Sequence, residues 1–162
     1  VVGVNVMRAS WMVNCLCSGL CRISPPVLRR RWASAASVVC KGQVLRALGH
    51  AQSDLSVGLV ADVEIRQLNR DYRDKNRATD VLSFSLVEGE WSGFRGTMLG
   101  DVVISIETAA RQARARHRSL NEEVTRLLIH GILHLLGHDH EEDEEARTMR
   151  AEERRLSTVC RS

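Results

Sequence analysis

Histidines are the residues of this sequence with the clearest capacity for chemistry. Four of the six histidines fall at positions 130, 134, 138 and 140. His130 and His134 stand four residues apart in a strongly apolar stretch, so in a helix they lie on one face. A single histidine on an apolar helix is usually a hydrogen-bonded core residue. A pair at this spacing, followed by further histidines, instead predicts a metal site.

The third ligand is predicted from helix geometry. A helical row from His130 to His138 is about 12 Å long at ~1.5 Å per residue, too long for three imidazoles to reach one ion at ~2.0–2.1 Å. Gly137 favours the left-handed conformation that ends a helix, so the chain can turn back and bring His140 to the site. We therefore expect His130, His134 and His140 to bind one ion, with His138 outside the ligand set.

Three imidazoles with an open fourth position form the donor set of a catalytic zinc site, and hydrolysis is the chemistry it serves. The spacing H-x3-H-x2-G-x2-H is also that of metzincin proteases. Those enzymes place a glutamate base directly after the first histidine, whereas this chain has Gly131 there. A metzincin-like metalloprotease without the usual base is therefore an alternative that the sequence disfavours.

The elements that position these histidines follow from the hydrophobic pattern. It predicts helices at residues 34–48, from 62 onward, at 107–118, at 119–136 and at 142–156, with strands at 55–61, 79–86 and 99–106. Gly49 is expected to end the first helix, and Asp62 to cap the second. The fold class is therefore α+β, a small mixed sheet packed with helices, in which helix 119–136 is the buried central helix that carries the histidines.

Three sequence blocks carry a family resemblance. The first is HGILHLLGHDH at 130–140, followed by Glu145, Met149 and Glu152. The second is LNRDYR at 68–73 with TDVLSF at 79–84, and the third is GDVVIS at 100–105. Together they resemble the YbeY family of metal-dependent endoribonucleases, in unbroken order over residues 34–156. The chain departs from the family at His138, where an aromatic ring is usual, and at Ser85, where proline is common.

The resemblance implies a zinc-dependent, single-strand-specific endoribonuclease. It would act in ribosomal RNA maturation, at the small-subunit 3′ end, and in ribosome quality control. It implies one zinc ion per chain on His130, His134 and His140, and Arg73 as a catalytic side chain near the metal. The implied partners are single-stranded RNA, ribosomal RNA and the small ribosomal subunit, with no membrane. A non-catalytic, zinc-containing ribosome-assembly factor is a second alternative.

Basic side chains near the second block are candidates for RNA binding. They are Arg70, Arg73, Lys75 and Arg77, which could contact phosphates or could form a solvated charged face. The arginines of the helix at 107–118 are expected to form a solvated face. Asp139 is expected to orient a ligand imidazole from outside the ligand set, with capping of the final helix as the other interpretation.

Composition and charge limit the number of domains and the classes of protein that this chain can belong to. The chain has 162 residues, which suits one domain, and only 4% aromatic residues, which disfavours a stacking sheet of the RNA-recognition type. Residues 1–50 carry a net charge of +7 and the remainder −4. Five cysteines, an odd number, make a disulfide framework an unfavoured interpretation.

The N-terminal stretch shows no clear period. We expect residues 1–26 to be a disordered or targeting-like extension, or to precede the true start, and residues 27–162 to form one endoribonuclease domain. The apolar run at 11–20 is too short for the ~20 residues of a membrane span. A cytoplasmic location is expected, with a mitochondrion or plastid as the alternative if the acid-free, arginine-rich residues 1–40 act as a transit peptide.

Overall fold

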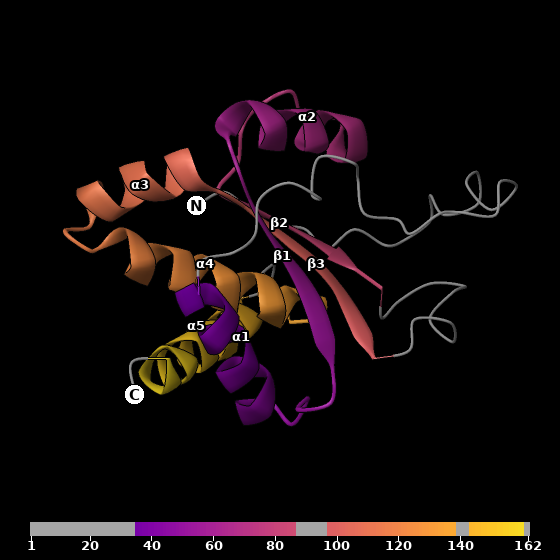
Figure 1. Cartoon of the computed structure of the whole chain (residues 1–162), viewed down its shortest axis with the longest axis vertical. Helices are drawn as coiled ribbons and strands as arrows, with labels where there is room; N and C mark the ends of the chain where they lie inside the picture. The colour runs from indigo at the N-terminus through magenta and orange to yellow at the C-terminus, as the bar shows by residue number, and fades with distance from the viewer. Residues whose placement is uncertain (1–34, 87–96, 139–142, 161–162) are drawn as a thin grey trace, which may run out of the picture.

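The computed structural model describes residues 35–86, 97–138 and 143–160. Their order confirms the predicted sequence of elements (Figure 1). The elements are α1 (Ala35–Ala47), β1 (Asp54–Val60), α2 (Asp62–Arg73), β2 (Val81–Ser85), β3 (Met98–Ser105), α3 (Ile106–Ala115), α4 (Leu120–Leu135) and α5 (Asp143–Val159). None of these described helices is both long and apolar enough to cross a membrane.

The described strands form one small mixed sheet, as predicted. Their order is β1-β3-β2, with β1 parallel to β3 and β2 antiparallel to it. The central strand β3 has the β-branched run that a strand buried on both faces requires. Val102, Val103 and Ile104 in this strand are fully buried.

Alternate residues of the strands face two separate layers of helices. Val102 and Ile104 of β3 belong to the larger core, which α4 fills together with α1 and α5. Val103, between them, belongs to a smaller cluster with Ile65 and Leu68 of α2. Figure 1 shows α2 apart from the group of α1, α4 and α5, with the strands between. The sheet therefore separates α2 from the helix that carries the histidines.

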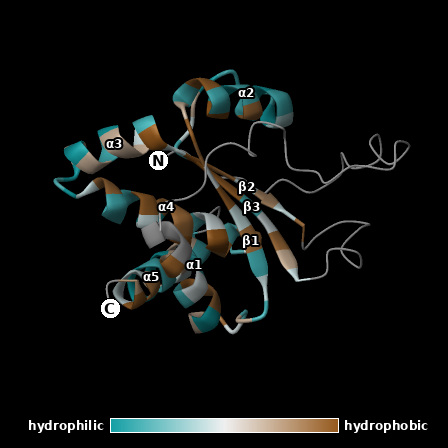
Figure 2. Cartoon of the chain, viewed as in Figure 1, coloured by the Kyte–Doolittle hydropathy of each residue, from teal (hydrophilic) through white to brown (hydrophobic). Residues whose placement is uncertain are grey.

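Helix α4 is the buried central helix that the sequence predicts. Ser119 and Glu122 form the expected capping box, in which the Ser119 hydroxyl accepts from the Glu122 N–H at 3.2 Å and the Glu122 carboxylate accepts from the Ser119 N–H at 2.9 Å. Leu120, at its start, is exposed, but most of its other apolar residues are almost completely inaccessible, namely Leu127, Leu128, Ile129, Ile132, Leu133 and Leu135. Figure 2 shows the hydrophobic colour along α4 and the strands, and more hydrophilic colour on α2 and α3.

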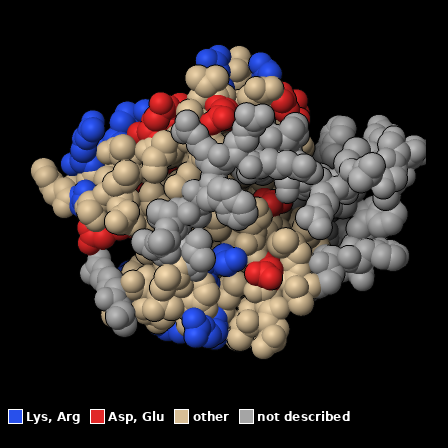
Figure 3. Space-filling model, viewed as in Figure 1, with Lys and Arg blue, Asp and Glu red and all other residues tan. Residues whose placement is uncertain are grey.

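The start of α2 differs from the expectation that Asp62 caps it. Asp62 is the first helical residue, and the N-cap is Ala61, whose N–H donates to the Glu64 carboxylate at 2.8 Å. The Asp62 carboxylate instead contacts α3, where it accepts a hydrogen bond from Thr108 Oγ1 at 2.7 Å and pairs with Arg111 at 2.8 Å. Figure 3 shows both basic and acidic side chains over α2 and α3.

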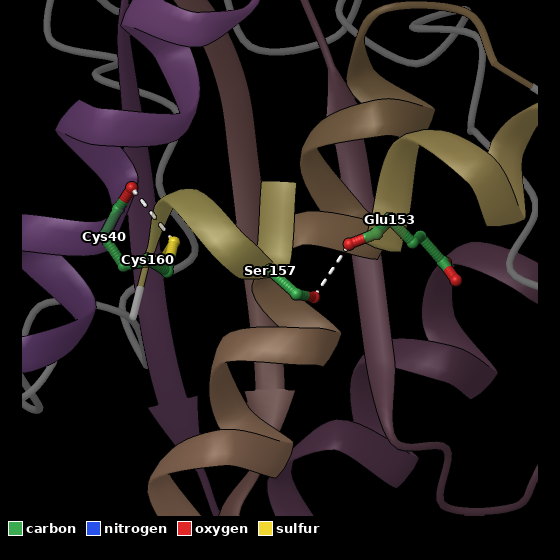
Figure 4. The surroundings of a disulfide bond; sticks show 4 residues. All are labelled: Cys40, Glu153, Ser157 and Cys160. Atoms are coloured by element: carbon green, nitrogen blue, oxygen red, sulfur yellow. Dashed lines mark hydrogen bonds between the residues drawn. A yellow bond between two sulfur atoms is a disulfide. The ribbon is translucent and has the colours of Figure 1, made fainter. Parts of the chain in front are cut away.

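A disulfide joins the first and last described helices. Cys40 of α1 and Cys160, which directly follows α5, are bonded with their Cα atoms 5.2 Å apart (Figure 4). The expectation that disulfides are unfavoured is therefore wrong for this pair. The two cysteines are 120 residues apart, and residue spacing alone cannot show that the ends of the domain meet. The other three cysteines lie outside the described residues.

Candidate metal centre

His130 and His134 lie side by side in α4, as their spacing predicts. Their ring centroids are 4.7 Å apart and the ring planes meet at 83°. His134 is fully buried, and the His130 side chain is 18% exposed. Two imidazoles bound to one tetrahedral zinc ion at ~2.0–2.1 Å have ring centres about 5 Å apart. The observed pair therefore has the separation that shared binding of one zinc ion requires.

Glu153 of α5 fixes the orientation of the His130 ring. Its Oε1 atom lies 2.6 Å from Nδ1 of His130. Burial alone would raise the pKa of Glu153, but the hydrogen bond and charge of His130, together with Arg126, outweigh burial and hold that pKa below its ordinary value. In the neutral ring that a metal requires, the ionised carboxylate accepts the proton on Nδ1 and Nε2 carries the lone pair. Metal-binding histidines characteristically have such a carboxylate partner.

The sequence interpretation missed Glu153. It treated residues 142–156 only as a charged helix, and Glu153 is one of several glutamates in that helix. The role that it assigned to Asp139, orienting a ligand imidazole, is filled at His130 by Glu153. A glutamate 23 residues from its histidine leaves no periodic signal, so the packing of α5 on α4 was needed to find it.

The C-terminal end of α4 confirms the predicted glycine turn. Gly137 has a φ of 86°, its N–H donates to the His134 carbonyl, and the His138 N–H donates to the Leu133 carbonyl. This is a Schellman motif. His138 therefore lies beyond the helix and does not extend the row formed by His130 and His134.

The third predicted ligand, His140, lies outside the described residues, as does Asp139. Within the part of the chain that the structure describes, no group of three or more metal-binding side chains is assembled. His130 and His134 thus supply two of the three predicted ligands. The full ligand set stays a prediction.

Gly131 shows why this chain cannot place the usual metzincin glutamate after His130. A Cβ atom added there would lie 2.7 Å from Cγ1 of Val102 and 3.0 Å from Oγ of Ser83, which also donates to the Gly131 carbonyl at 3.1 Å. Contacts this short leave no room for a side chain between α4 and the sheet. A glutamate base at this position would have to displace β3.

The predicted RNA-binding residues lie at the end of α2 and in the loop after it. Burial and the charge of nearby Arg77 both lower the pKa of Arg73, the last residue of α2. The positive charges of Arg73 and Arg77 therefore oppose each other, and a bound phosphate would offset this repulsion. Lys75 is exposed, whereas the Arg70 charge is partly balanced by Asp71 at 3.1 Å.

The loop after Arg73 leads round to the histidine side of the sheet. Asp80, at its end, lines a cavity of about 410 Å³ together with His130. The Asp80 carboxylate accepts from the Val81 N–H at 3.0 Å and from Gln112 Nε2 at 3.1 Å, which ties the loop to β2 and α3. The structure thus brings the end of this loop to His130, while α2 itself covers the opposite face of the sheet.

Comparison with known proteins agrees with this geometry. A family model described as "Endoribonuclease YbeY" matches residues 28–160. The chain belongs to the YbeY family. Because the family is metal-dependent, we expect the site that contains His130 and His134 to bind a metal.

Curated YbeY relatives from bacteria share much of the sequence. A protein described as "Endoribonuclease YbeY" from an Anaeromyxobacter species is 52% identical over 113 residues, which cover 70% of this chain and 57% of that protein. The relative from Geobacter metallireducens is 45% identical over 119 residues, covering 72% and 79%. The relative from Aquifex aeolicus is 51% identical over 115 residues, covering 71% and 69%. The chain thus spans little more than half the length of some curated YbeY proteins.

A solved structure supports the fold. The solution structure of TM1509 from Thermotoga maritima superposes with a TM-score of 0.58 at 27% sequence identity. The match covers 79% of this chain and 83% of the Thermotoga protein. The fold of this chain is therefore similar to that of a solved protein.

Proposed function

We propose that the chain is a zinc-dependent, single-strand-specific endoribonuclease that acts in ribosomal RNA maturation, including the small-subunit 3′ end, and in ribosome quality control. The observation that carries the proposal is the imidazole pair of His130 and His134, 4.7 Å apart, with Glu153 bonded to the first ring. Such a pair is what a catalytic zinc site would need in a chain of the YbeY family.

One zinc ion, held by His130, His134 and His140, would supply positive charge and Lewis acidity beside a phosphodiester. Glu153 holds the proton of His130 at Nδ1 and so presents Nε2 in the orientation for binding. Burial of His134 shields its ring from water and fixes its position. These residues therefore preorganise the site before RNA arrives.

Arg73 is the proposed catalytic side chain, balancing the negative charge that builds up on the cleaved phosphate. Arg77 and Lys75, which are both exposed in the loop after α2, would contact phosphates of the same strand. Arg70, which pairs with Asp71, would contribute least to RNA binding. The small ribosomal subunit is the proposed partner, and the cytoplasm the proposed location, with an organelle as the alternative.

The test is an RNA cleavage assay on the purified full chain with zinc. A single-stranded RNA oligonucleotide, the same sequence in a duplex, and casein are incubated separately with and without chelator. We expect cleavage of the single strand alone, abolished by chelator and restored by zinc. Casein cleavage without RNA cleavage would establish the protease alternative. Unfolding on zinc removal, with no RNA cut under any condition, would establish the assembly-factor alternative.

A further inference from the structure

The loop that follows α2, residues 74–80, carries two of the proposed RNA contacts. Lys75 and Arg77 are both exposed in it. Asp74 begins the loop in the left-handed conformation, with a φ of 54°, so the chain turns sharply as the helix ends. A loop whose backbone is held in place before RNA arrives loses less conformational entropy on binding. What holds this backbone therefore bears on how well its side chains bind phosphates.

A buried amide on α2 holds the loop. Asn69 is 2% exposed and lies on the same face of the helix as Ile65, which packs against the sheet. Its Nδ2 atom donates to the Arg77 carbonyl at 2.8 Å, and its own backbone carbonyl accepts from the Lys75 N–H at 3.2 Å. Asn69 is therefore bonded to the backbone of both residues whose side chains are proposed to contact RNA.

The burial of Asn69 is explained by this bond and not by apolar packing. Burying an amide beside apolar side chains costs free energy unless the amide is hydrogen-bonded. Within the described residues Oδ1 of Asn69 has no hydrogen-bond partner, so the bond donated to Arg77 is what offsets the burial. Leucine, which is similar in size, would fill the same space without that bond. The asparagine thus supplies a donor for the loop.

The far end of the loop is held separately. The Asp80 carbonyl accepts from the Ser105 N–H at 2.9 Å, and the Asp80 carboxylate accepts from Gln112 at 3.1 Å. These partners belong to β3 and α3, and neither depends on Asn69. Loss of the Asn69 amide would therefore free the middle of the loop and leave Asp80, beside His130, in place. Its effect on RNA binding should be separate from zinc binding.

We propose that Asn69 is a positioning residue for RNA binding. Its amide holds the loop so that Lys75 and Arg77 present their charges to phosphates of a single strand in a fixed arrangement. The inference rests on the proposed function and deepens it, because it assigns the preorganisation of two proposed RNA contacts to a residue that makes no such contact itself.

The experiment measures RNA binding separately from cleavage. The full chain with zinc is titrated with a fluorescently labelled, single-stranded 2′-O-methyl RNA oligonucleotide, and binding is followed by fluorescence anisotropy. A gel after each titration verifies that the oligonucleotide is intact. Asn69→Leu should bind about tenfold more weakly than wild type, which is the size of effect expected from losing one hydrogen bond that holds the binding conformation. Its zinc content should equal that of wild type.

Two further variants control for the substitution itself. Gln67→Leu makes the same change at an exposed amide of the same helix and should alter RNA affinity less than twofold. Asn69→Ala, which also lacks the donor, should repeat the tenfold loss and replaces Asn69→Leu if leucine prevents folding. Melting temperature and zinc content are measured for every variant.

An effect on loop position must act through the loop's basic side chains. The variant Lys75→Ala/Arg77→Ala keeps both backbone bonds to Asn69, and in that background Asn69→Leu should weaken RNA binding less than twofold. The slope of log affinity against log salt concentration should also fall by about 0.7 for each phosphate contact that Asn69→Leu removes. A merely structural role would leave the slope unchanged and lower the affinity equally in both backgrounds.

RNA affinity of folded Asn69→Leu within twofold of wild type would overturn the inference, even if the RNA cleavage assay succeeds. A tenfold loss that persists in the double-alanine background would overturn it as well. A loss confined to the chain that retains Lys75 and Arg77, with a reduced salt slope, would support it. If that result came with no cleavage of RNA, the positioning role would stand and the nuclease function would fail.

Discussion

Replacing Glu153 by glutamine should weaken zinc binding without unfolding the chain. Glutamine has nearly the same shape, and its carbonyl oxygen can still accept from Nδ1 of His130. It lacks the negative charge that makes the imidazole a stronger ligand. The contact at stake is the 2.6 Å approach of Oε1 to Nδ1 between side chains that are 21% and 18% exposed.

The expected loss of zinc affinity can be estimated from other carboxylates that orient a ligand histidine. Removing a partner of a ligand histidine typically costs ~10–100-fold in metal affinity, which corresponds to about 1.4–2.7 kcal/mol. Both side chains are mostly buried, so solvent screens the pair weakly and the upper half of this range applies. Glu153→Ala should cost more than Glu153→Gln, because it leaves the Nδ1–H without an acceptor.

The assay is competition for zinc against a chelator of known affinity, read by elemental analysis after desalting. The matched control is Glu152→Gln, one residue away on the same helix. It removes the same negative charge from a side chain that pairs with Arg155 at 2.8 Å. That control should change zinc affinity less than twofold. Equal affinities of wild type and Glu153→Gln would refute the orienting role of Glu153.

Three further substitutions, the first with a matched control, test the packing, the charge network and the loop. Gly131→Ala should lower the free energy of unfolding by about 1–3 kcal/mol in urea, because its Cβ would lie 2.7 Å from Val102, whereas Gly42→Ala in α1 meets nothing nearer than 3.7 Å and should raise it by ~0.5–1 kcal/mol. Burial raises the pKa of Asp62, but hydrogen bonds and Arg111 outweigh it and lower that pKa below 3.8. Wild type should therefore exceed Asp62→Asn in stability at pH 7, and this advantage should shrink as the pH falls below 3.8 towards the lowered pKa; an advantage that grows over that range would contradict this sign. Arg73→Ala should lose RNA cleavage with little change in melting temperature, and a parallel loss of both would make Arg73 structural.

The ends of α4 and the pairing of His130 with His134 were predictable because their signals are local in sequence. The capping box at Ser119 and the left-handed Gly137 fix both ends of α4 through residues close in sequence. The four-residue spacing of His130 and His134 then places both rings on one face without any knowledge of the tertiary structure. The order of helices and strands followed for the same reason, because hydrophobic periods are local.

Contacts between distant segments could not be predicted in this way. Glu153 reaches His130 across 23 residues, and Cys40 reaches Cys160 across 120. Glu123, in the first turn of α4, is buried because Arg116 and Arg126 pair with it in the interior. In each case the decisive fact is which helix packs against which, and a hydrophobic pattern shows only that a face is buried.

The zinc content of His134 variants tests the central claim most directly, namely that His130 and His134 hold one zinc ion together with His140. Elemental analysis of the purified wild type should find one zinc per chain, and so should His138→Tyr, since His138 is outside the predicted ligand set. His134→Gln, chosen because His134 is fully buried and alanine would leave a cavity, should remain folded by circular dichroism and contain almost no zinc. One full equivalent of zinc in folded His134→Gln would contradict the assignment.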